Sequence, residues 1–182
     1  RFPSHWQSTG TIHDFLARNG IPGLAGVDTR ALTRRLRSAG VMMGTITADE
    51  TPGEALERLR SLPRYDFVDF VKEVTTPNAY TWEPEVAGQP LPGGKGECRI
   101  VAIDCGLKYN ILRILKGLGC QPLAVPCTTS AAEVMALKPD GIVLSPGPGD
   151  PALLGYMEET VRNLVGRKPI LGICLGHQML GR

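Results

Sequence analysis

The chain has 182 residues, which is enough for one domain or two small ones with a buried core. Its apolar content of 42% and charged content of 21% are ordinary for a globular protein, and its net charge of +2 is too small to indicate binding to nucleic acid or to an anionic membrane surface. No apolar stretch approaches the ~20 residues of a membrane span. We therefore expect no nucleic-acid and no membrane partner.

The cysteines and histidines give no metal-binding pattern. The cysteines form no C-x-x-C pair, which favours a reducing compartment and hence the cytoplasm. The histidines are not grouped with cysteines or carboxylates, so we expect no structural metal on this chain. These residues are Cys98, Cys105, Cys120, Cys127 and Cys174, with His5, His13 and His177.

Residues 1–75 alternate short predicted helices with short apolar runs. The first helix covers residues 11–19 and the second lies between Asp28, which caps it, and Gly40, which ends it. A third helix starts at Thr51-Pro-Gly-Glu54, a capping box with proline at the first helical position. The run over residues 67–74 is rich in valine and phenylalanine and is interpreted as a strand.

Four arginines lie on the second predicted helix. A cluster of this kind can bind phosphate or dock a partner subunit, but here no aromatic residues are interleaved and the overall charge is low. We interpret the arginines as a solvated helix face and keep docking of a partner subunit as the alternative. They are Arg30, Arg34, Arg35 and Arg37.

The composition changes over residues 76–97, where recurring proline and glycine exclude a continuous helix or central strand. We interpret this stretch as an interdomain linker. Residues 98–182 then alternate apolar runs with helical patterns, which predicts right-handed crossovers and an α/β fold with a mostly parallel sheet. The predicted strands cover residues 99–103, 122–125, 141–144 and 170–173, and the predicted helices cover 110–118, 130–137 and 155–165.

The third of these strands leads into the loop Ser145-Pro-Gly-Pro-Gly-Asp-Pro151. Three prolines and two glycines in seven residues exclude a regular element. The loop follows the carboxyl end of a predicted parallel strand, where ligands bind in open α/β sheets. Taken alone it would be an ordinary connection, but beside the next motif it is interpreted as a source of main-chain N–H donors for an oxyanion, from Gly147 or Gly149.

The fourth strand runs into Gly172-Ile-Cys-Leu-Gly176, a pattern typical of a nucleophile elbow. Small residues on either side of Cys174 allow a tight strand-to-helix turn that lifts its side chain clear of the sheet. The partial positive charge of a helix N-terminus favours the reactive thiolate. The alternative is a buried core cysteine, because cysteine is among the most buried residue types.

Together the two motifs resemble the glutaminase domain of class I (triad-type) glutamine amidotransferases. Further stretches resemble the small-subunit family of carbamoyl-phosphate synthases: Ile21–Arg37, Gly40–Gly44 and Val101–Arg113. The resemblance implies a chain that covers about the middle half of such a subunit. Residues 1–75 would be the end of its amino-terminal domain, and residues 98–182 the first half of a flavodoxin-like glutaminase domain.

The resemblance also implies an activity. Cys174 would attack the side-chain amide of L-glutamine to form a thioester, and the released ammonia would pass to a large synthetase subunit, for pyrimidine and arginine biosynthesis. The ATP and metal ions would belong to that large subunit, so the resemblance implies no cofactor on this chain. Gly147 or Gly149 and Leu175 would donate to the oxyanion, and Gln178 would contact glutamine. The family's catalytic His and Glu are expected beyond residue 182, so the 182-residue polypeptide alone is expected to be inactive. His177 is expected to be structural.

Two other functions stay open. One is a non-catalytic docking module for a synthetase subunit, with a vestigial elbow. The other is a different cysteine or ester hydrolase, because many chemistries share the elbow. The glutaminase of another amidotransferase, such as anthranilate synthase, is disfavoured by residues 28–37, since those subunits lack the domain that contains them.

Overall fold

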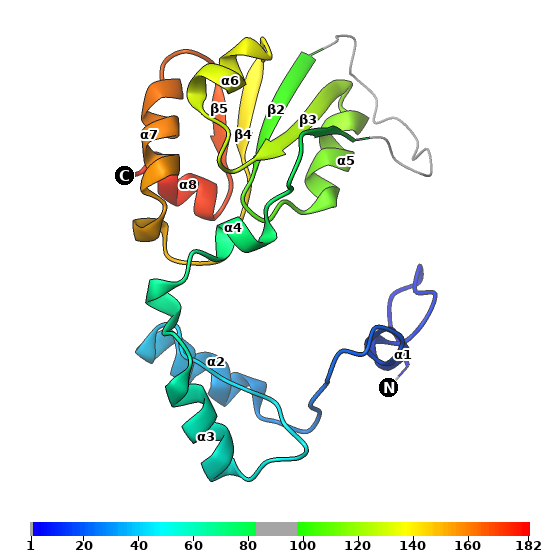
Figure 1. The fold of residues 1–182 in the computed structure, drawn as a ribbon. Coiled ribbons are helices and arrows are strands. Elements are labelled where there is room, and N and C mark those ends of the chain that lie inside the picture. The colour runs from blue at the N-terminus through cyan, green and yellow to red at the C-terminus, as the bar shows by residue number, and fades with distance from the viewer. Residues whose placement is uncertain (1, 83–97) are drawn as a thin grey trace. The chain divides into compact units, whose positions relative to one another are not determined.

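The computed structural model describes residues 2–82 and 98–182. Contacts between Cα atoms divide the chain into two compact units, Arg1–Tyr65 and Asp66–Arg182 (Figure 1). The predicted linker over residues 76–97 falls mostly outside the described residues, and the predicted domain boundaries stay a prediction. No helix in the described ranges is long and apolar enough to cross a membrane.

The first unit contains the three helices expected from its capping signals. Each begins after the predicted capping residue, whose side-chain oxygen accepts a hydrogen bond from the backbone N–H three positions later. In the first and third helices an acidic side chain also accepts a hydrogen bond from the cap's N–H, which completes a capping box. The helices are α1 (Ile12–Arg18), α2 (Thr29–Ala39) and α3 (Pro52–Ser61).

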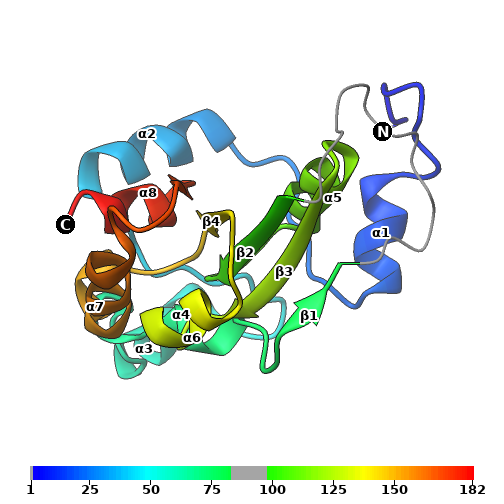
Figure 2. The same cartoon turned by 90° about the horizontal axis from the view of Figure 1, so that it is seen from above.

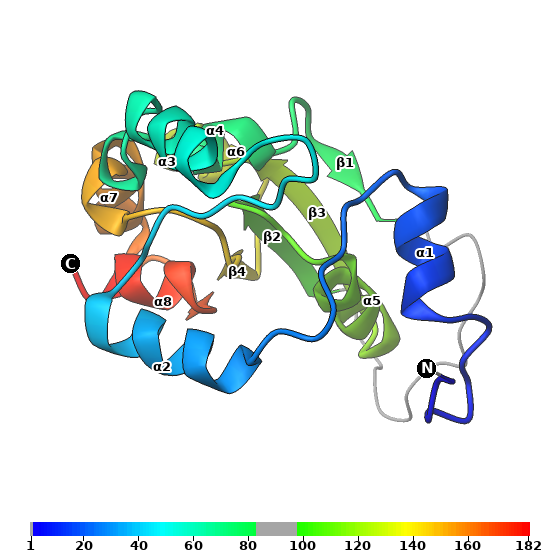
Figure 3. The same ribbon diagram turned by 90° about the horizontal axis from the view of Figure 1, so that it is seen from below.

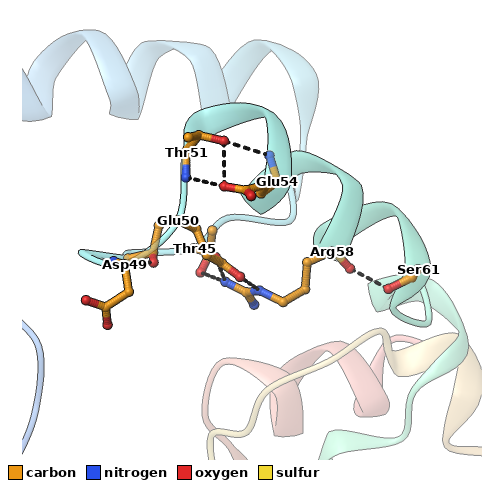
Figure 4. A network of polar contacts seen from close by, with 8 residues as sticks. Thr45, Asp49, Glu50, Thr51, Glu54, Arg58 and Ser61 are labelled. Carbon is orange, nitrogen blue, oxygen red and sulfur yellow. Dashed lines mark hydrogen bonds and ion pairs between the residues drawn. The ribbon is translucent and has the colours of Figure 1, made fainter.

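The start of α3 is held by two polar contacts (Figure 4). Thr51 and Glu54 form the capping box, with the Thr51 N–H donating to Glu54 Oε2 at 2.8 Å. One helical turn further, Arg58 binds both carboxylate oxygens of Glu50 at 2.8 Å and also donates to Thr45 Oγ1 at 3.1 Å. This pair ties the segment before α3 to the helix itself.

The second helix, α2, has no buried residue. All four of its arginines are exposed, as expected for a solvated helix face. On the apolar face, Leu32 and Leu36 are 55% and 40% exposed.

The predicted strand over residues 67–74 is wrong. The chain instead forms a short 3₁₀-helix, η1 (Tyr65–Phe67), and the helix α4 (Phe70–Val74). Asp69 caps α4 by accepting a hydrogen bond from the Lys72 N–H at 3.3 Å, and Val71 is the one fully buried residue of the helix. A side-chain cap and one-sided burial therefore outweigh the strand preference of valine and phenylalanine.

The second unit is built on a five-stranded sheet in the order β1-β3-β2-β4-β5. The last four strands of the chain run parallel, which confirms the mostly parallel α/β sheet. The short first strand was not predicted; it pairs antiparallel with β3 at the edge of the sheet. The strands are β1 (Tyr80–Thr81), β2 (Cys98–Asp104), β3 (Cys120–Pro126), β4 (Gly141–Leu144) and β5 (Ile170–Gly172).

Helices cover both faces of this sheet. The buried strands direct apolar side chains to both faces, so each face needs a covering layer. On one face, Val101, Ile103 and Leu144 pack with residues of α4, α6, α7 and α8. On the other, Ala102 and Val143 pack with Leu112 of α5. Figure 2 shows α5 across the sheet from α6 and α7. The helices are α5 (Tyr109–Gly117), α6 (Ala131–Ala136), α7 (Gly155–Leu164), preceded by the 3₁₀-helix η2 (Pro151–Leu153), and α8 (Leu175–Leu180).

The carboxyl ends of the parallel strands meet at one edge of the sheet. Strand β4 lies between β2 and β5, and Ile103 is in register with Leu144, which in turn is in register with Gly172. The turns that follow these three strands are therefore neighbours, although they are far apart in the sequence. Figure 3 views the unit from this side and shows α8 starting beside the end of β4.

Candidate active site

Cys174 occupies the turn between β5 and α8, as the sequence predicted. Its backbone has φ 53° and ψ −111°, a positive φ that a non-glycine residue rarely adopts and that costs about 1–3 kcal/mol when the surrounding structure imposes it. The residue is exposed. The alternative of a cysteine packed in the core is thereby excluded.

Two glycines make this turn possible because they lack a Cβ, which lets neighbouring backbone segments pack directly against them. A Cβ added at Gly172 would lie 2.5 Å from the Gly176 carbonyl oxygen and 2.7 Å from the His177 nitrogen. A Cβ added at Gly176 would overlap the Leu144 carbonyl oxygen. The first turn of α8 therefore packs directly on the ends of β4 and β5, which no larger residue at either position would allow.

Backbone hydrogen bonds fix the strained residue on both sides. The Ile173 N–H donates to the Leu144 carbonyl at 3.0 Å, which extends the pairing of β4 and β5 up to the nucleophile position. The Gln178 N–H donates to the Cys174 carbonyl at 3.0 Å and starts α8. Because these hydrogen bonds belong to the sheet and to α8, both elements hold Cys174 in its strained backbone conformation.

The proline-rich loop after β4 lies against the elbow. A Cβ added at Gly147 would lie 2.8 Å from Leu175 Cδ2 and would overlap the Cys105 carbonyl oxygen, so the loop passes between the elbow and the turn after β2. Gly149 has φ +98°, a conformation that favours glycine. The two predicted motifs are therefore in contact, as the oxyanion-hole interpretation requires.

Several backbone N–H groups of the described residues at this junction are not paired within the protein. Among the hydrogen bonds of the described residues, the N–H groups of Gly147, Gly149 and Leu175 have no acceptor. Pro148, between the two glycines, has no N–H. In a water-excluded site, N–H donors aimed at a developing negative charge are among the strongest stabilising groups available to an enzyme.

Gln178 lies four residues after Cys174, one helical turn along α8, and is exposed. Its N–H donates to the carbonyl of Cys174, the residue that precedes α8, so Gln178 lies one turn from the elbow. His177 is also exposed.

Two buried polar residues, one at the start of the loop and one at the end of β2, were not identified as site residues from the sequence. Ser145 is 0% exposed and Asp104 is 6% exposed; within the described part of the chain they are the only buried polar or charged residues. Both are held by hydrogen bonds at the ends of β4 and β2. The sequence signal for Asp104 was a carboxylate ending an apolar strand directly before a Cys-Gly turn.

The thiols near the site differ in their environment. Burial, and then the neighbouring Cys127, raise the pKa of the Cys105 thiol to about 12. Cys105 is fully buried, whereas Cys174 is exposed. Among the described residues, no group of three or more His, Cys, Asp or Glu side chains is placed to hold a metal ion.

The comparisons with known proteins fit this geometry. Residues 101–182 match the family model of class-I glutamine amidotransferases, and residues 1–46 match that of the carbamoyl-phosphate synthase small chain, CPSase domain. A carbamoyl phosphate synthase small chain from Syntrophotalea carbinolica is 45% identical over 184 residues, covering 98% of this chain and 49% of that relative.

Small chains from two other organisms match over the same extent. The protein from Pseudomonas aeruginosa is 44% identical, with 97% of this chain and 49% of the relative covered, and the protein from Methanopyrus kandleri is 42% identical, with 98% and 48% covered. The chain belongs to the carbamoyl-phosphate synthase small-chain family. It spans about half the length of the small chains that it matches.

The small-chain match over residues 1–46 also separates this chain from other amidotransferases. The segment from Asp28 to Arg37, which was expected to exclude the anthranilate branch, lies inside that match. The elbow and the proline-rich loop lie inside the class-I amidotransferase match.

Proposed function

We propose that this chain belongs to the glutamine-hydrolysing subunit of a carbamoyl-phosphate synthase and that Cys174 is its nucleophile. One observation carries the proposal: an exposed cysteine in a strained elbow lies beside N–H groups that have no acceptor among the described residues. The family membership supplies the substrate, L-glutamine.

The proposed reaction begins with attack of the Cys174 sulfur on the side-chain carbonyl carbon of glutamine. The carbonyl oxygen becomes an oxyanion, which accepts hydrogen bonds from the N–H of Leu175 and from the N–H of Gly147 or Gly149. One such donor is typically worth roughly 10²–10³ in rate. Collapse of the intermediate breaks the carbon–nitrogen bond, ammonia leaves, and water then cleaves the glutamyl thioester to glutamate. Gln178 contacts the bound substrate.

Proton transfer needs a base, because the thiol must lose a proton and the leaving nitrogen must gain one. We assign this role to a histidine oriented by a glutamate, both supplied by residues outside 1–182. His177 is given no catalytic role. The 182-residue polypeptide alone is therefore predicted to release ammonia from glutamine at a negligible rate.

The released ammonia is proposed to be used by a large synthetase subunit, which would carry the ATP and metal ions, in the synthesis of carbamoyl phosphate for pyrimidines and arginine. We propose no cofactor on residues 1–182 and a cytoplasmic location. The exposed arginines of α2 are candidates for contact with that subunit. A cytoplasmic location agrees with five cysteines that are all free thiols.

The test is ammonia release from glutamine by the full-length protein in the presence of its large subunit. We expect turnover in the wild type and none in Cys174→Ser, with unchanged melting temperatures. A chloroketone analogue of glutamine should alkylate Cys174 and be blocked by glutamine. Turnover that survives Cys174→Ser would overturn the proposed nucleophile.

The same experiment separates the other functions. A non-catalytic docking module would bind the large subunit but neither hydrolyse glutamine nor react with the chloroketone. A different hydrolase would react with the chloroketone without protection by glutamine and would cleave an ester substrate in its place.

A further inference from the structure

We propose that Ser145 and Asp104 are positioning residues that hold the oxyanion-binding loop against the nucleophile elbow. This inference rests on the proposed function and extends it to two buried side chains that do not touch glutamine. Their hydroxyl and carboxylate groups fix the turn after β2 and the start of the loop after β4, and these two segments are packed against one another.

The Ser145 hydroxyl connects the two segments directly. It accepts a hydrogen bond from the Cys105 N–H at 2.8 Å and donates one to the Pro146 carbonyl at 2.8 Å. The Ser145 N–H donates to the Ile103 carbonyl at 3.1 Å, which continues the pairing of β4 with β2. A fully buried hydroxyl with both hydrogen-bonding roles filled defines the direction in which the loop leaves the strand.

Asp104 fixes the turn after β2 from the other side. Its Oδ1 accepts hydrogen bonds from the N–H groups of Gly106 at 2.8 Å and Leu107 at 2.7 Å, and its Oδ2 accepts one from the Thr76 N–H at 2.9 Å. The Asp104 carbonyl also accepts a hydrogen bond from the Thr75 hydroxyl at 2.6 Å. Hydrogen bonds to an ionised carboxylate are about twice as strong as neutral ones, so this turn is held rigidly.

The fixed turn supports the loop by direct packing. A Cβ added at Gly106 would lie 3.2 Å from Pro148 Cδ and 3.3 Å from Gly147 Cα. A Cβ at Gly147 would meet both Cys105 of this turn and Leu175 of the elbow. The loop is thus clamped between the turn and the elbow, and a shift of the turn would move the Gly147 and Gly149 N–H groups relative to Cys174.

Displacing these N–H groups should weaken binding of the transition state much more than binding of the substrate. An oxyanion donor contributes little to binding the planar amide of glutamine and much to stabilising the tetrahedral intermediate. A misplacement of about 1 Å in a preorganised site costs on the order of 10²-fold in rate. Loss of the positioning contacts should therefore lower kcat and leave the KM for glutamine almost unchanged.

The experiment compares Ser145→Ala, Asp104→Ala and Asp104→Asn in the full-length protein with its large subunit. We expect kcat for ammonia release to fall about 10- to 100-fold in both alanine variants, with KM within about threefold of wild type. Asp104→Asn should recover part of the loss, because the amide oxygen can still accept the Gly106 and Leu107 hydrogen bonds, while the amide NH2 would face the Thr76 N–H, donor against donor.

Two further measurements distinguish positioning from general destabilisation. The aldehyde analogue of glutamine forms a tetrahedral adduct with a thiol, so its inhibition constant should rise by the same factor as kcat falls. The rate of Cys174 alkylation by iodoacetamide should stay at the wild-type value, because the elbow itself is intact. Ser130→Ala, which removes a capping serine of α6, is the matched control and should lower the melting temperature without lowering kcat.

Several outcomes would overturn the inference. Wild-type kcat in both Ser145→Ala and Asp104→Ala would do so, and so would an equal loss of kcat in Ser130→Ala or no recovery in Asp104→Asn. If the alanine variants do not fold, Asp104→Asn decides the question: its remaining loss of kcat must be matched by an equal rise in the inhibition constant of the aldehyde, and wild-type values of both would overturn the inference. A wild-type protein that releases no ammonia above Cys174→Ser would overturn the proposed function itself, and the positioning roles with it.

Discussion

Replacement of Gly147 by alanine tests the contact between the proline-rich loop and the elbow. The added Cβ would overlap the Cys105 carbonyl oxygen and lie 2.8 Å from Leu175 Cδ2, where ordinary contact begins at 3.4 Å. The Leu175 contact alone demands a shift of roughly 0.6 Å, and the overlap with a backbone oxygen demands more, because that atom is fixed by the turn after β2. The loop must therefore move away from the Cys105 carbonyl and from Leu175, which would displace its N–H groups relative to Cys174.

The expected effect is large in rate and moderate in stability. Misplacing the donors by about 1 Å should lower kcat for ammonia release by about 100-fold, equivalent to about 2.7 kcal/mol in the transition state. Overpacking at this position should cost about 1–3 kcal/mol of unfolding free energy. The assay is steady-state ammonia release by the full-length protein with its large subunit, together with a denaturant titration of each variant.

Gly155→Ala is the matched control. A Cβ at Gly155 would meet nothing within 4 Å, and the residue starts α7, so alanine should leave kcat unchanged and raise stability by up to about 1 kcal/mol. If Gly147→Ala keeps kcat within about threefold of wild type at unchanged stability, the loop does not supply the oxyanion donors and the reasoning fails.

Three further predictions follow from the thiols and the caps. Iodoacetamide at neutral pH should label Cys174 and leave Cys105 unlabelled, because burial raises the pKa of Cys105 to about 12; mass mapping that finds Cys105 labelled first would contradict this. Cys174→Gly should abolish turnover but raise unfolding free energy by about 1 kcal/mol, since glycine tolerates φ 53°; a lower stability would argue against strain there. Ser130→Ala should lower the melting temperature at neutral pH, and this difference from wild type should shrink as the pH falls. The Ser130 hydroxyl, and then its N–H, lower the pKa of Glu133 below 4.5, so the cap is complete above about pH 4.5 and lost as pH falls through the folded-state pKa; a deficit independent of pH would refute this.

The sheet and the elbow were predictable because their signals are local. The apolar runs over residues 99–103 and 141–144 match β2 and β4 to within a residue at each end, and the glycines around Cys174 indicated a tight turn. Each of these features follows from side-chain size and hydrophobicity within a few residues.

The errors and omissions concern features that depend on the rest of the fold. Residues 70–74 have strand composition, but Asp69 caps a helix there and Val71 alone is needed by the core. Strand β1 exists because Tyr80 and Thr81 pair with the backbone of β3, which no pattern in two residues can reveal.

The roles of Ser145 and Asp104 could not be predicted for a similar reason. Serine and aspartate are common beside turns, and only the register of β2 and β4 brings the Ser145 hydroxyl to the Cys105 N–H. Their sequence neighbours indicate a loop. The partners that give them a role lie 40 positions away for Ser145 and 28 for the Thr76 contact of Asp104.

The pairing of β4 between β2 and β5 has a consequence for folding kinetics. No short segment can form the site in isolation, because its turns are joined only through pairings of residues distant in sequence. Closing such loops is slow relative to helix formation. The Ile173 amide, which donates to Leu144 beside the nucleophile, should therefore gain protection from solvent exchange in one of the last steps of folding, after the amides of α5.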